Sequence, residues 1–471
     1  ATLGFGSPGV DREGVDQLLQ APPLDQMHVG VYAVDARTGR ALFAHNAERR
    51  FVPASNQKIL VTAAAISLLG PEYRFTTAVH ARGHRDGARL NGDLVLTGSG
   101  DPSLSGRYWD SGTEALGALA DSIHATGLTH VSGAVVIDVS AWDSTTVAPT
   151  REVEDLRYAY GATGGAFAID EGELEVVVAA GSYAGSPARV GWSPLGTPDF
   201  VDSRIVTSGP DDSERVQSTY LPESRRIVLN GRIAAGTVDT LSFALRDPVR
   251  QAGEVFRNAL ARVGIEIEGG VEVRWTPVDG CPQARRPCAM GEPVAALVSP
   301  PLIELASGVL GPSQNWMTEQ LVLKLGERFG EGGSWPEGIG VIETFLVERM
   351  GVDSLDVSAR DGSGLSAYNL VTPRAVVRVL ARMGAGDVGP AFRSAMPGPG
   401  SPDSTLEERL LDLRGRLFAK TGTISNVNSL SGYLVGDDGR EIVFSILANG
   451  SGLPAPRVEA VLDDLVRSLA R

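Results

Sequence analysis

The sequence predicts an α/β fold in which the two ends of the chain form one discontinuous domain around an inserted, mainly β region. Three features of the 471 residues lead to this prediction. A hairpin pattern and an apolar helical run stand near the start, β-like runs with Gly, Asp and Pro turns fill the middle, and helices with a hairpin close the chain. We therefore expect the discontinuous domain at residues 1–72 and 287–471 and the insert, in one or two lobes, at residues 73–286.

The first segment reads as a short helix, a hairpin and a buried helix. Residues 10–19 are amphipathic, and strand-like runs at 28–34 and 40–45 flank a turn. Apolar residues recur at helical spacing over 59–69, just before a Gly-Pro helix stop.

The same patterns of apolar spacing and turn residues predict the elements of the insert and of the last third of the chain. In the insert, strands are expected at 75–81, 94–97, 131–139, 174–180, 226–229 and 240–245, and helices at 114–125 and 248–263. In the last third, helices are expected at 301–309, 314–329, 338–350, 373–383 and 455–469, and strands at 415–420, 429–435 and 441–447. A turn rich in Gly and Asp joins the last two strands and is typical of a hairpin.

Composition argues against several classes of partner. The formal net charge of −15 and the scattered positive charges argue against nucleic acid or an anionic membrane surface. No uninterrupted apolar run approaches the length of a membrane span, so we expect no transmembrane segment. The histidines show no metal-like clustering, and His80 and His84 stand in a strand-and-turn context, so we expect neither a metal nor an organic cofactor. Nothing in the sequence indicates the oligomeric state.

Two features bear on the compartment. Cys281 and Cys288 flank a loop rich in Pro and Arg, where we expect a small disulfide, with two free thiols as the alternative. The chain begins at Ala1 without a signal-peptide pattern, so either a signal peptide was removed or the chain was trimmed.

A serine stands three positions before a lysine at the start of the predicted buried helix. Residues three apart share a helix face, so Ser55 Oγ and Lys58 Nζ can meet. A buried lysine of lowered pKa could then take the serine proton. A Ser-x-x-Lys pattern alone is weak, since a capping serine and a surface lysine give the same letters.

Lysine usage strengthens the catalytic interpretation. Of the 42 basic residues, 39 are arginines, and only Lys58, Lys324 and Lys420 are lysines. Arginine cannot act as a base near neutral pH, whereas a desolvated lysine can. We therefore expect function at Lys58 and Lys420, and take Lys324 as a surface charge on a helix.

Two further stretches carry suitable chemistry. In Lys420-Thr421-Gly422-Thr423, which follows a strand-like run, the lysine and the hydroxyls can bind a carboxylate and the glycine admits close approach of a ligand. The alternative is a strand end with a solvated lysine. Ser313 stands at the start of a predicted helix, where capping is the simple reading.

The ordered trio Ser55-x-x-Lys58, Ser313-x-Asn315 and Lys420-Thr421-Gly422 resembles the signature of penicillin-recognising serine peptidases. The stretches Gly-Asp-Pro-Ser-Leu at 100–104 and Asp-Gly-Ser-Gly-Leu-Ser at 361–366 resemble the D-Ala-D-Ala carboxypeptidases also called class C low-molecular-mass penicillin-binding proteins. The resemblance covers nearly the whole chain. It implies an antiparallel sheet of five strands flanked by helices, of the β-lactamase and transpeptidase type, with a large insert.

The resemblance also implies a role for each residue. Ser55 would be the acylated nucleophile and Lys58 its general base. Ser313 and Asn315 would assist proton transfer and position the peptide. The backbone N–H groups of Ser55 and Thr423 would form the oxyanion hole, in which one donor is worth ~3–4 kcal/mol.

The remaining roles concern substrate binding. Lys420 and Thr421 would bind the terminal carboxylate, and Gly422 would let the substrate approach the backbone closely. In the insert, the run at 154–160 resembles the segment that meets the free amino end of the stem peptide, which suggests Asp155 and Tyr160.

One departure concerns specificity. Relatives often carry arginine after the motif at 361–366, whereas this chain has Ala367. An arginine there would hold an anionic group of the substrate, so its absence puts a diaminopimelate preference in doubt.

The expected function is a serine-type D-Ala-D-Ala carboxypeptidase acting on peptidoglycan stem peptides, inhibited by β-lactams and located outside the cytoplasm. Endopeptidase action on cross-links stays open. The alternatives are a β-lactamase or esterase on the same scaffold, or a non-catalytic cell-wall-binding protein.

Overall fold

The computed structural model describes residues 10–162, 164–194, 201–213, 215–221, 223–224, 226–276 and 293–471. It divides into two compact units. Unit 1 comprises the described residues up to Arg74 together with Pro300–Gly330 and Ser334–Arg471. Unit 2 comprises the described residues of Phe75–Ser299 together with Glu331–Gly333.

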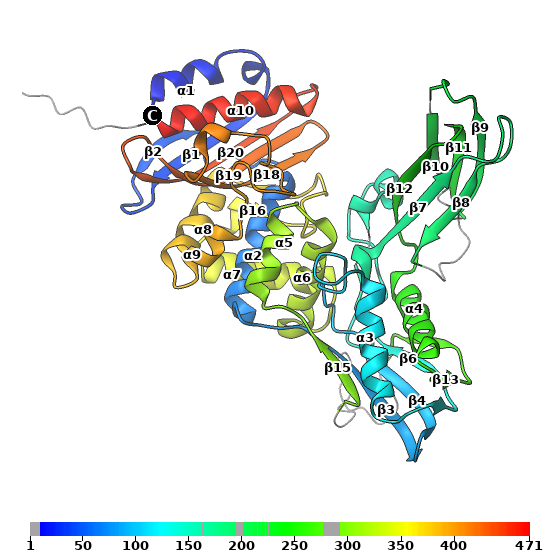
Figure 1. Cartoon of the computed structure of the whole chain (residues 1–471). Helices are drawn as coiled ribbons and strands as arrows, with labels where there is room; N and C mark the ends of the chain where they lie inside the picture. Colours follow the sequence, from blue (N-terminus) through cyan, green and yellow to red (C-terminus); the bar gives the residue numbers. More distant parts are fainter. Residues whose placement is uncertain are drawn as a thin grey trace, which may run out of the picture. The chain divides into compact units, whose positions relative to one another are not determined.

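Unit 1 is built on an antiparallel sheet of five strands in the order β18-β19-β20-β1-β2 (Figure 1). The strands are β1 (His28–Asp35), β2 (Ala41–His45), β18 (Leu417–Ile424), β19 (Val427–Val435) and β20 (Glu441–Asn449). The early strand β1 pairs with the late strand β20, with Val31 opposite Ile446. Both ends of the chain therefore complete one sheet, as predicted.

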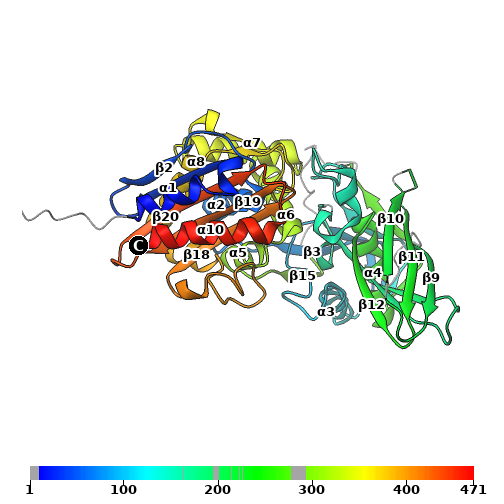
Figure 2. The same cartoon turned by 90° about the horizontal axis from the view of Figure 1, so that it is seen from above.

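Helices cover both faces of this sheet (Figures 1 and 2). On one face lie α1 (Arg12–Leu19) and α10 (Ala455–Ala470), and their apolar stripes form a buried core with the strands. On the other face lie α2 (Gln57–Leu69), α5 (Leu302–Leu310), α6 (Asn315–Phe329), α7 (Trp335–Glu348), α8 (Pro373–Ala385) and α9 (Gly389–Ser394). The result is an α/β/α arrangement with α2 near the centre.

Helix α2 is buried because α5, α6, α7 and α8 all contact it. Every residue from Gln57 to Ile66 is buried, including the polar ones. The helix ends at Gly70, whose φ of 97° lets the chain turn away. A helix surrounded in this way gives the residues at its N-terminus a rigid base.

Unit 2 is rich in β-structure, as predicted. A mixed sheet of seven strands contains β3 (Thr76–Asp86), β4 (Arg89–Thr97), β5 (His130–Val131), β6 (Val135–Asp138), β13 (Glu266–Ile267), β14 (Val271–Arg274) and β15 (Ala295–Val298). The helices α3 (Gly112–His124) and α4 (Pro248–Arg262) accompany it.

Two sheets of three strands share a second core in unit 2. They contain β7 (Glu173–Ala179), β8 (Arg189–Ser193) and β12 (Val238–Ala244) in one sheet, and β9 (Val201–Ser208), β10 (Arg215–Leu221) and β11 (Arg226–Ala234) in the other. The sequence analysis missed β8, β9 and β10. In β10 exposed residues alternate with half-buried ones, so its pattern is weakly apolar.

Several predicted boundaries shift. Helix α7 begins at Trp335 rather than at residue 338, because Ser334 accepts a hydrogen bond from Glu337 N and caps it. Strand β18 runs on to Ile424, beyond the predicted end at residue 420, because β19 pairs with its whole length. Within the described part of the chain, every helix is too short or too polar to cross a membrane.

Candidate active site

Ser55 lies in the 3-10 turn Ala54–Asn56, directly before α2. Ala54 has a φ of 47°, a left-handed conformation that costs a non-glycine residue about 1–3 kcal/mol. A loop packs tightly against this turn, since a Cβ on Gly364 would lie 1.8 Å from Ala54 O. The half-buried serine is therefore presented on a strained turn that its surroundings hold in place.

Lys58 lies one helical turn after Ser55, and its side chain is fully buried. Its Nζ is 2.8 Å from Ser55 Oγ, 2.7 Å from Asn315 Oδ1 and 2.6 Å from the carbonyl oxygen of Ser363. The amide and carbonyl oxygens can only accept hydrogen bonds. In the neutral amine they occupy both N–H groups, so the lone pair faces Ser55 Oγ. The arrangement suits a lysine that takes a proton from serine.

Asp361 shapes the loop that supplies the Ser363 carbonyl. This carboxylate is fully buried and accepts from Gly364 N at 2.9 Å, from Ser366 N at 2.8 Å and from Asn369 Nδ2 at 2.7 Å. Three such bonds satisfy much of a buried carboxylate. They fix the turn in which the Ser363 carbonyl faces Lys58.

The sequence analysis missed Glu319 and Ser363. Glu319 stands one helical turn after Asn315 on α6 and is 1% exposed. Its carboxylate accepts from Gly362 N at 3.0 Å, Ser363 N at 2.9 Å and Trp335 Nε1 at 2.8 Å. The signal for it in the sequence was its i,i+4 spacing from Asn315, which puts both residues on one helix face.

Ser313 does not cap α6, so the simple reading of this serine as a helix cap does not hold. Its φ is 64°, whereas a capping residue takes an extended conformation, and the cap is Gln314, whose side chain accepts from Met317 N. The left-handed turn at Ser313 brings Asn315 to the first position of the helix, where it reaches Lys58. The Ser313 side chain itself is half-buried.

Strand β18 brings the Lys-Thr-Gly stretch beside Ser55. A Cβ on Gly422 would lie 2.8 Å from Ser55 N and 2.3 Å from Ser429 Oγ, so only glycine fits this approach. Thr421 is 5% exposed and its hydroxyl lies 2.6 Å from that of Thr405. The edge of the sheet therefore runs along the serine turn.

Lys420 is fully buried, and its Nζ donates to Thr421 O at 2.8 Å. Burial, together with the charge of Lys58, holds the pKa of Lys420 well below its usual range. An amine in this state can gain a proton when an anion arrives.

The side chain of Thr423 points toward α10. Its hydroxyl donates to Glu459 Oε1 at 3.0 Å, and Glu459 lies 3.6 Å from Arg409 Nη1. The backbone N–H is therefore the group of Thr423 to consider for the oxyanion hole.

Asp155 and Tyr160 lie together in unit 2, where the Tyr160 hydroxyl donates to Asp155 Oδ1 at 3.1 Å. The rings of Tyr158 and Tyr160 stack with centroids 5.1 Å apart. Partial burial and the Asp155 charge raise the pKa of Tyr160 to about 12. Tyr160 is 47% exposed, so its ring can meet a ligand.

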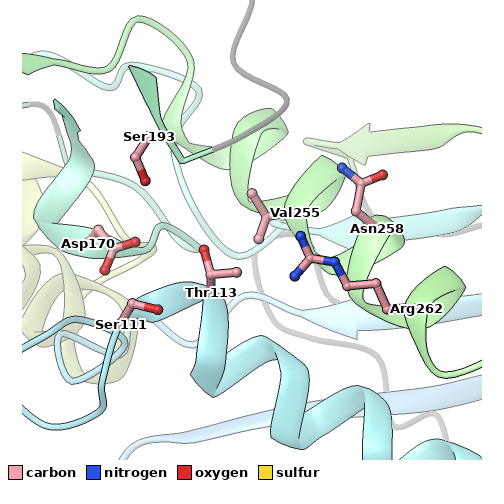
Figure 3. A pocket seen from close by; sticks show the side chains of 7 residues that line it. All are labelled: Ser111, Thr113, Asp170, Ser193, Val255, Asn258 and Arg262. Atoms are coloured by element: carbon pink, nitrogen blue, oxygen red, sulfur yellow. The ribbon is translucent and has the colours of Figure 1, made fainter. Parts of the chain in front are cut away.

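A separate polar cavity of about 200 Å³ lies within unit 2 (Figure 3). It is lined by Ser111, Thr113, Asp170, Ser193, Val255, Asn258 and Arg262. None of these residues belongs to the predicted site, and no lysine stands among them.

The remaining predictions concern Lys324, the two cysteines and metal ligands. Lys324, expected on the surface, is buried and pairs with Glu327 at 2.8 Å, because α6 is enclosed along most of its length. Cys281 and Cys288 lie outside the described residues, so their disulfide stays a prediction. Among the residues that the structure describes, no group of three or more His, Cys, Asp or Glu side chains could hold a metal.

The fold and the site together define a class: a hydrolase whose serine pairs with a lysine at the start of a buried helix, beside the edge strand of a five-stranded sheet. The model of the D-Ala-D-Ala carboxypeptidase 3 (S13) family matches residues 12–470. The chain belongs to this family, and its predicted class, a serine-type D-Ala-D-Ala carboxypeptidase, is confirmed.

Similar proteins agree with this membership. A D-alanyl-D-alanine carboxypeptidase of Actinomadura sp. (strain R39) is 32% identical over 98% of this chain and 84% of that protein. The carboxypeptidase DacB of Mycolicibacterium smegmatis is 28% identical over 89% of this chain and 75% of that protein.

A solved structure agrees with the fold. The crystal structure of penicillin binding protein 4 (dacB) from Haemophilus influenzae superposes with a TM-score of 0.82 at 23% identity, covering 97% of this chain and 98% of that one. The predicted fold is thereby confirmed.

Proposed function

We propose that this enzyme removes the terminal D-Ala of peptidoglycan stem peptides through an acyl-enzyme on Ser55. The observation that carries the proposal is the 2.8 Å between Lys58 Nζ and Ser55 Oγ, with Asn315 and Ser363 holding the other two sides of the amine. This geometry turns a weak nucleophile into an activated one.

The reaction runs in two halves. Ser55 Oγ attacks the carbonyl carbon of the penultimate D-Ala while its proton passes to Lys58 Nζ. The backbone N–H groups of Ser55 and Thr423 bind the oxyanion, and the C–N bond then breaks. The leaving amine takes the proton from Lys58, with the Ser313 hydroxyl as relay. Water then attacks the ester and restores Ser55.

Lys420 and Thr421 bind the terminal carboxylate of the peptide, with Gly422 leaving room for its backbone. The depressed pKa of Lys420 suits this role, because an arriving carboxylate favours the protonated amine. Binding of substrate is then coupled to uptake of a proton.

Asp155 and Tyr160 receive the free amino end of the stem peptide, since a carboxylate and an exposed ring attract an ammonium group. Ala367 is exposed and offers no charge, which favours a third stem residue without a free carboxylate. Endopeptidase action on cross-links is the same reaction with a longer leaving group.

Peptidoglycan lies outside the cytoplasmic membrane, so the proposal includes an extracytoplasmic location. β-Lactams resemble the substrate in carrying an amide beside a carboxylate, and we expect them to acylate Ser55.

Intact mass after brief exposure to benzylpenicillin tests the proposal. We expect a lasting adduct on wild type and on Ser67→Ala, a matched change of an exposed serine on the same helix, and none on Ser55→Ala. Peptide substrates would then be assayed for release of D-Ala. Penicillin consumed without an adduct would indicate a β-lactamase instead. If benzylpenicillin neither formed an adduct nor was consumed, the result would count against the proposal.

A further inference from the structure

Glu319 is a buried carboxylate that accepts hydrogen bonds from the active-site loop at 362–363 and from Trp335 at the start of α7. At 1% exposure it accepts from the backbone N–H groups of Gly362 and Ser363 and from the indole of Trp335. Burying a charge is unfavourable unless hydrogen bonds compensate for the lost water. A glutamate in this position therefore calls for a function beyond filling space.

We propose that Glu319 is a positioning residue that holds Lys58 in the orientation needed to deprotonate Ser55. The inference rests on the proposed role of Lys58 as general base. Glu319 binds the N–H of Ser363, and the carbonyl of the same residue lies 2.6 Å from Lys58 Nζ. Glu319 thus holds the backbone of Ser363, and the Ser363 carbonyl in turn holds the amine of Lys58.

The peptide unit between Ser363 and Gly364 is clamped on two sides. Its N–H donates to Asp361 Oδ1 at 2.9 Å, and its carbonyl faces Lys58. Glu319 orients the preceding peptide unit through the Ser363 N–H. The Ser363 carbonyl therefore cannot rotate away from Lys58 unless the hydrogen bond to Asp361 or the one to Glu319 breaks.

Helix α6 in this way controls both hydrogen-bond acceptors, Asn315 Oδ1 and the Ser363 carbonyl, that lie beside Ser55 Oγ at Nζ. Asn315 Oδ1 accepts from Lys58 directly, and Glu319, four residues later on the same face, acts through the Ser363 carbonyl. With both acceptors fixed, the remaining position on the nitrogen faces Ser55 Oγ.

The charge of Glu319 adds an electrostatic effect. Lys58 and Lys420 are both buried, and the charge of Lys58 disfavours protonation of Lys420. A buried anion near Lys58 favours the ammonium that forms as Ser55 attacks, as the third member of a catalytic triad does for its base. Loss of the anion should move the acid limb of the acylation profile to lower pH.

Two substitutions separate this role from packing. Glu319→Gln keeps the shape but leaves one acceptor oxygen for three donors and removes the charge. Trp335→Phe removes the indole donor and some buried volume, while Glu319 keeps its charge and both loop contacts. The second variant is the matched control for damage to the core.

The test measures the rate of acylation by benzylpenicillin across pH, with circular dichroism and thermal unfolding of each variant. We expect Glu319→Gln to fold and to acylate at least about tenfold more slowly, with its acid limb at lower pH. We expect Trp335→Phe to stay within about twofold of wild type with an unshifted profile. Equal rates and profiles for Glu319→Gln and wild type, or an equal loss in both variants, would overturn the inference.

Glu319→Asp keeps the test decisive if Glu319→Gln does not fold. The shorter side chain keeps the charge but reaches the loop less well, so we expect slower acylation with the acid limb at its wild-type position. A wild-type rate in Glu319→Asp would overturn the positioning role. Wild type that forms no adduct at all would instead refute the proposed function.

Discussion

The side-chain amide of Asn56 donates a hydrogen bond of 2.9 Å to the carbonyl oxygen of Lys420, 364 residues further along the chain. Asn56 is fully buried, and its Oδ1 has no hydrogen-bond partner among the residues that the structure describes, which is an unusual state for a buried amide. A second long-range bond, of 2.7 Å from Ser429 Oγ to Pro53 O, lies next to it. Because Lys420 lies on β18 and Ser429 on β19, these buried hydrogen bonds hold the serine turn and the residue before it to both strands.

Replacing Asn56 by alanine should loosen the serine turn from β18. The Lys420 carbonyl would lose this hydrogen bond, which costs about 1–3 kcal/mol of unfolding free energy, and acylation should slow as well. Denaturant unfolding and the rate of penicillin acylation measure the two effects.

Asn449→Ala is the control for this variant. It removes two bonds to Val52, of 2.9 and 3.1 Å, without touching β18. If Asn449→Ala slowed acylation as much as Asn56→Ala did, at similar stability, the hydrogen bond to Lys420 would not be the cause of the slower acylation.

Lys420→Met should stabilise the protein while abolishing recognition of a carboxylate. The folded-state pKa of Lys420 lies well below the 10.5 of an ordinary lysine, so between the two values only the unfolded chain holds the proton. Wild-type stability therefore rises with pH across this window. We expect the advantage of the variant in melting temperature to shrink as the pH rises toward 10.5.

Lys324→Met provides the matched comparison, since Lys324 is also buried on the inside of unit 1 but pairs with Glu327 at 2.8 Å. Loss of the Lys324 amine should destabilise the protein, because the Glu327 carboxylate is then left without this ion-pair partner. A lower melting temperature for Lys420→Met at neutral pH would contradict the first expectation.

Gly364→Ala should inactivate the enzyme. The added methyl would lie 1.8 Å from Ala54 O, and the φ of 81° is strained for alanine. Relief requires movement of either the serine turn or the Ser363 carbonyl, and both belong to the site. We expect no penicillin adduct by mass within the time that labels wild type.

Gly351→Ala is a suitable control, because its φ is 68° but its new methyl would meet only the end of Arg378, at 3.4 Å. It should cost about 1 kcal/mol of stability and leave acylation intact. An equal loss of acylation in both variants would show that backbone strain, rather than contact with Ala54, decides the outcome, and full acylation of Gly364→Ala would contradict the prediction.

Glu173→Gln should change how the stability of unit 2 depends on pH. Burial, then the charge of Glu171, raises the pKa of Glu173 to about 7 from an ordinary 4.5. Between these values only the folded state holds the proton, so its contribution is full below 4.5 and is lost as pH rises through about 7. The loss is at most about 3 kcal/mol.

Thermal unfolding at pH 5 and pH 8 measures this effect. We expect Glu173→Gln to flatten the decline, and Glu175→Gln, an exposed neighbour on β7, to leave it unchanged. A decline of the same slope in wild type and Glu173→Gln would show that other groups cause it.

The sequence revealed the parts of the site that depend on local spacing. Ser55 and Lys58 are three residues apart on one helix, so their contact followed from helix geometry, and the scarcity of lysine pointed to Lys420. The contact of Glu319 with Ser363 spans 44 residues and a loop without a regular pattern. A glutamate in a helix also reads as a solvated charge, and only tertiary packing buries it.

Errors in the sequence analysis have similar causes. Capping was the simple alternative for Ser313 because serine favours that position, but the turn places Gln314 there. Lys324 was taken as exposed because the helix pattern does not reveal that neighbouring helices enclose it. Strand β18 was cut short at Lys420 because Thr-Gly-Thr has little strand character, whereas pairing with β19 extends it.

The order in which the chain is made gives the shared sheet a further consequence. The serine turn emerges from the ribosome early, but β18 begins only at Leu417 and β20 ends at Asn449. Until the hairpin of β19 and β20 is synthesised, β1 lacks β20, one of its two partner strands, and β18 beside Ser55 lacks its pairing with β19. The nascent enzyme therefore carries its nucleophile in an inert form until this hairpin has been made, and activity begins only after that point.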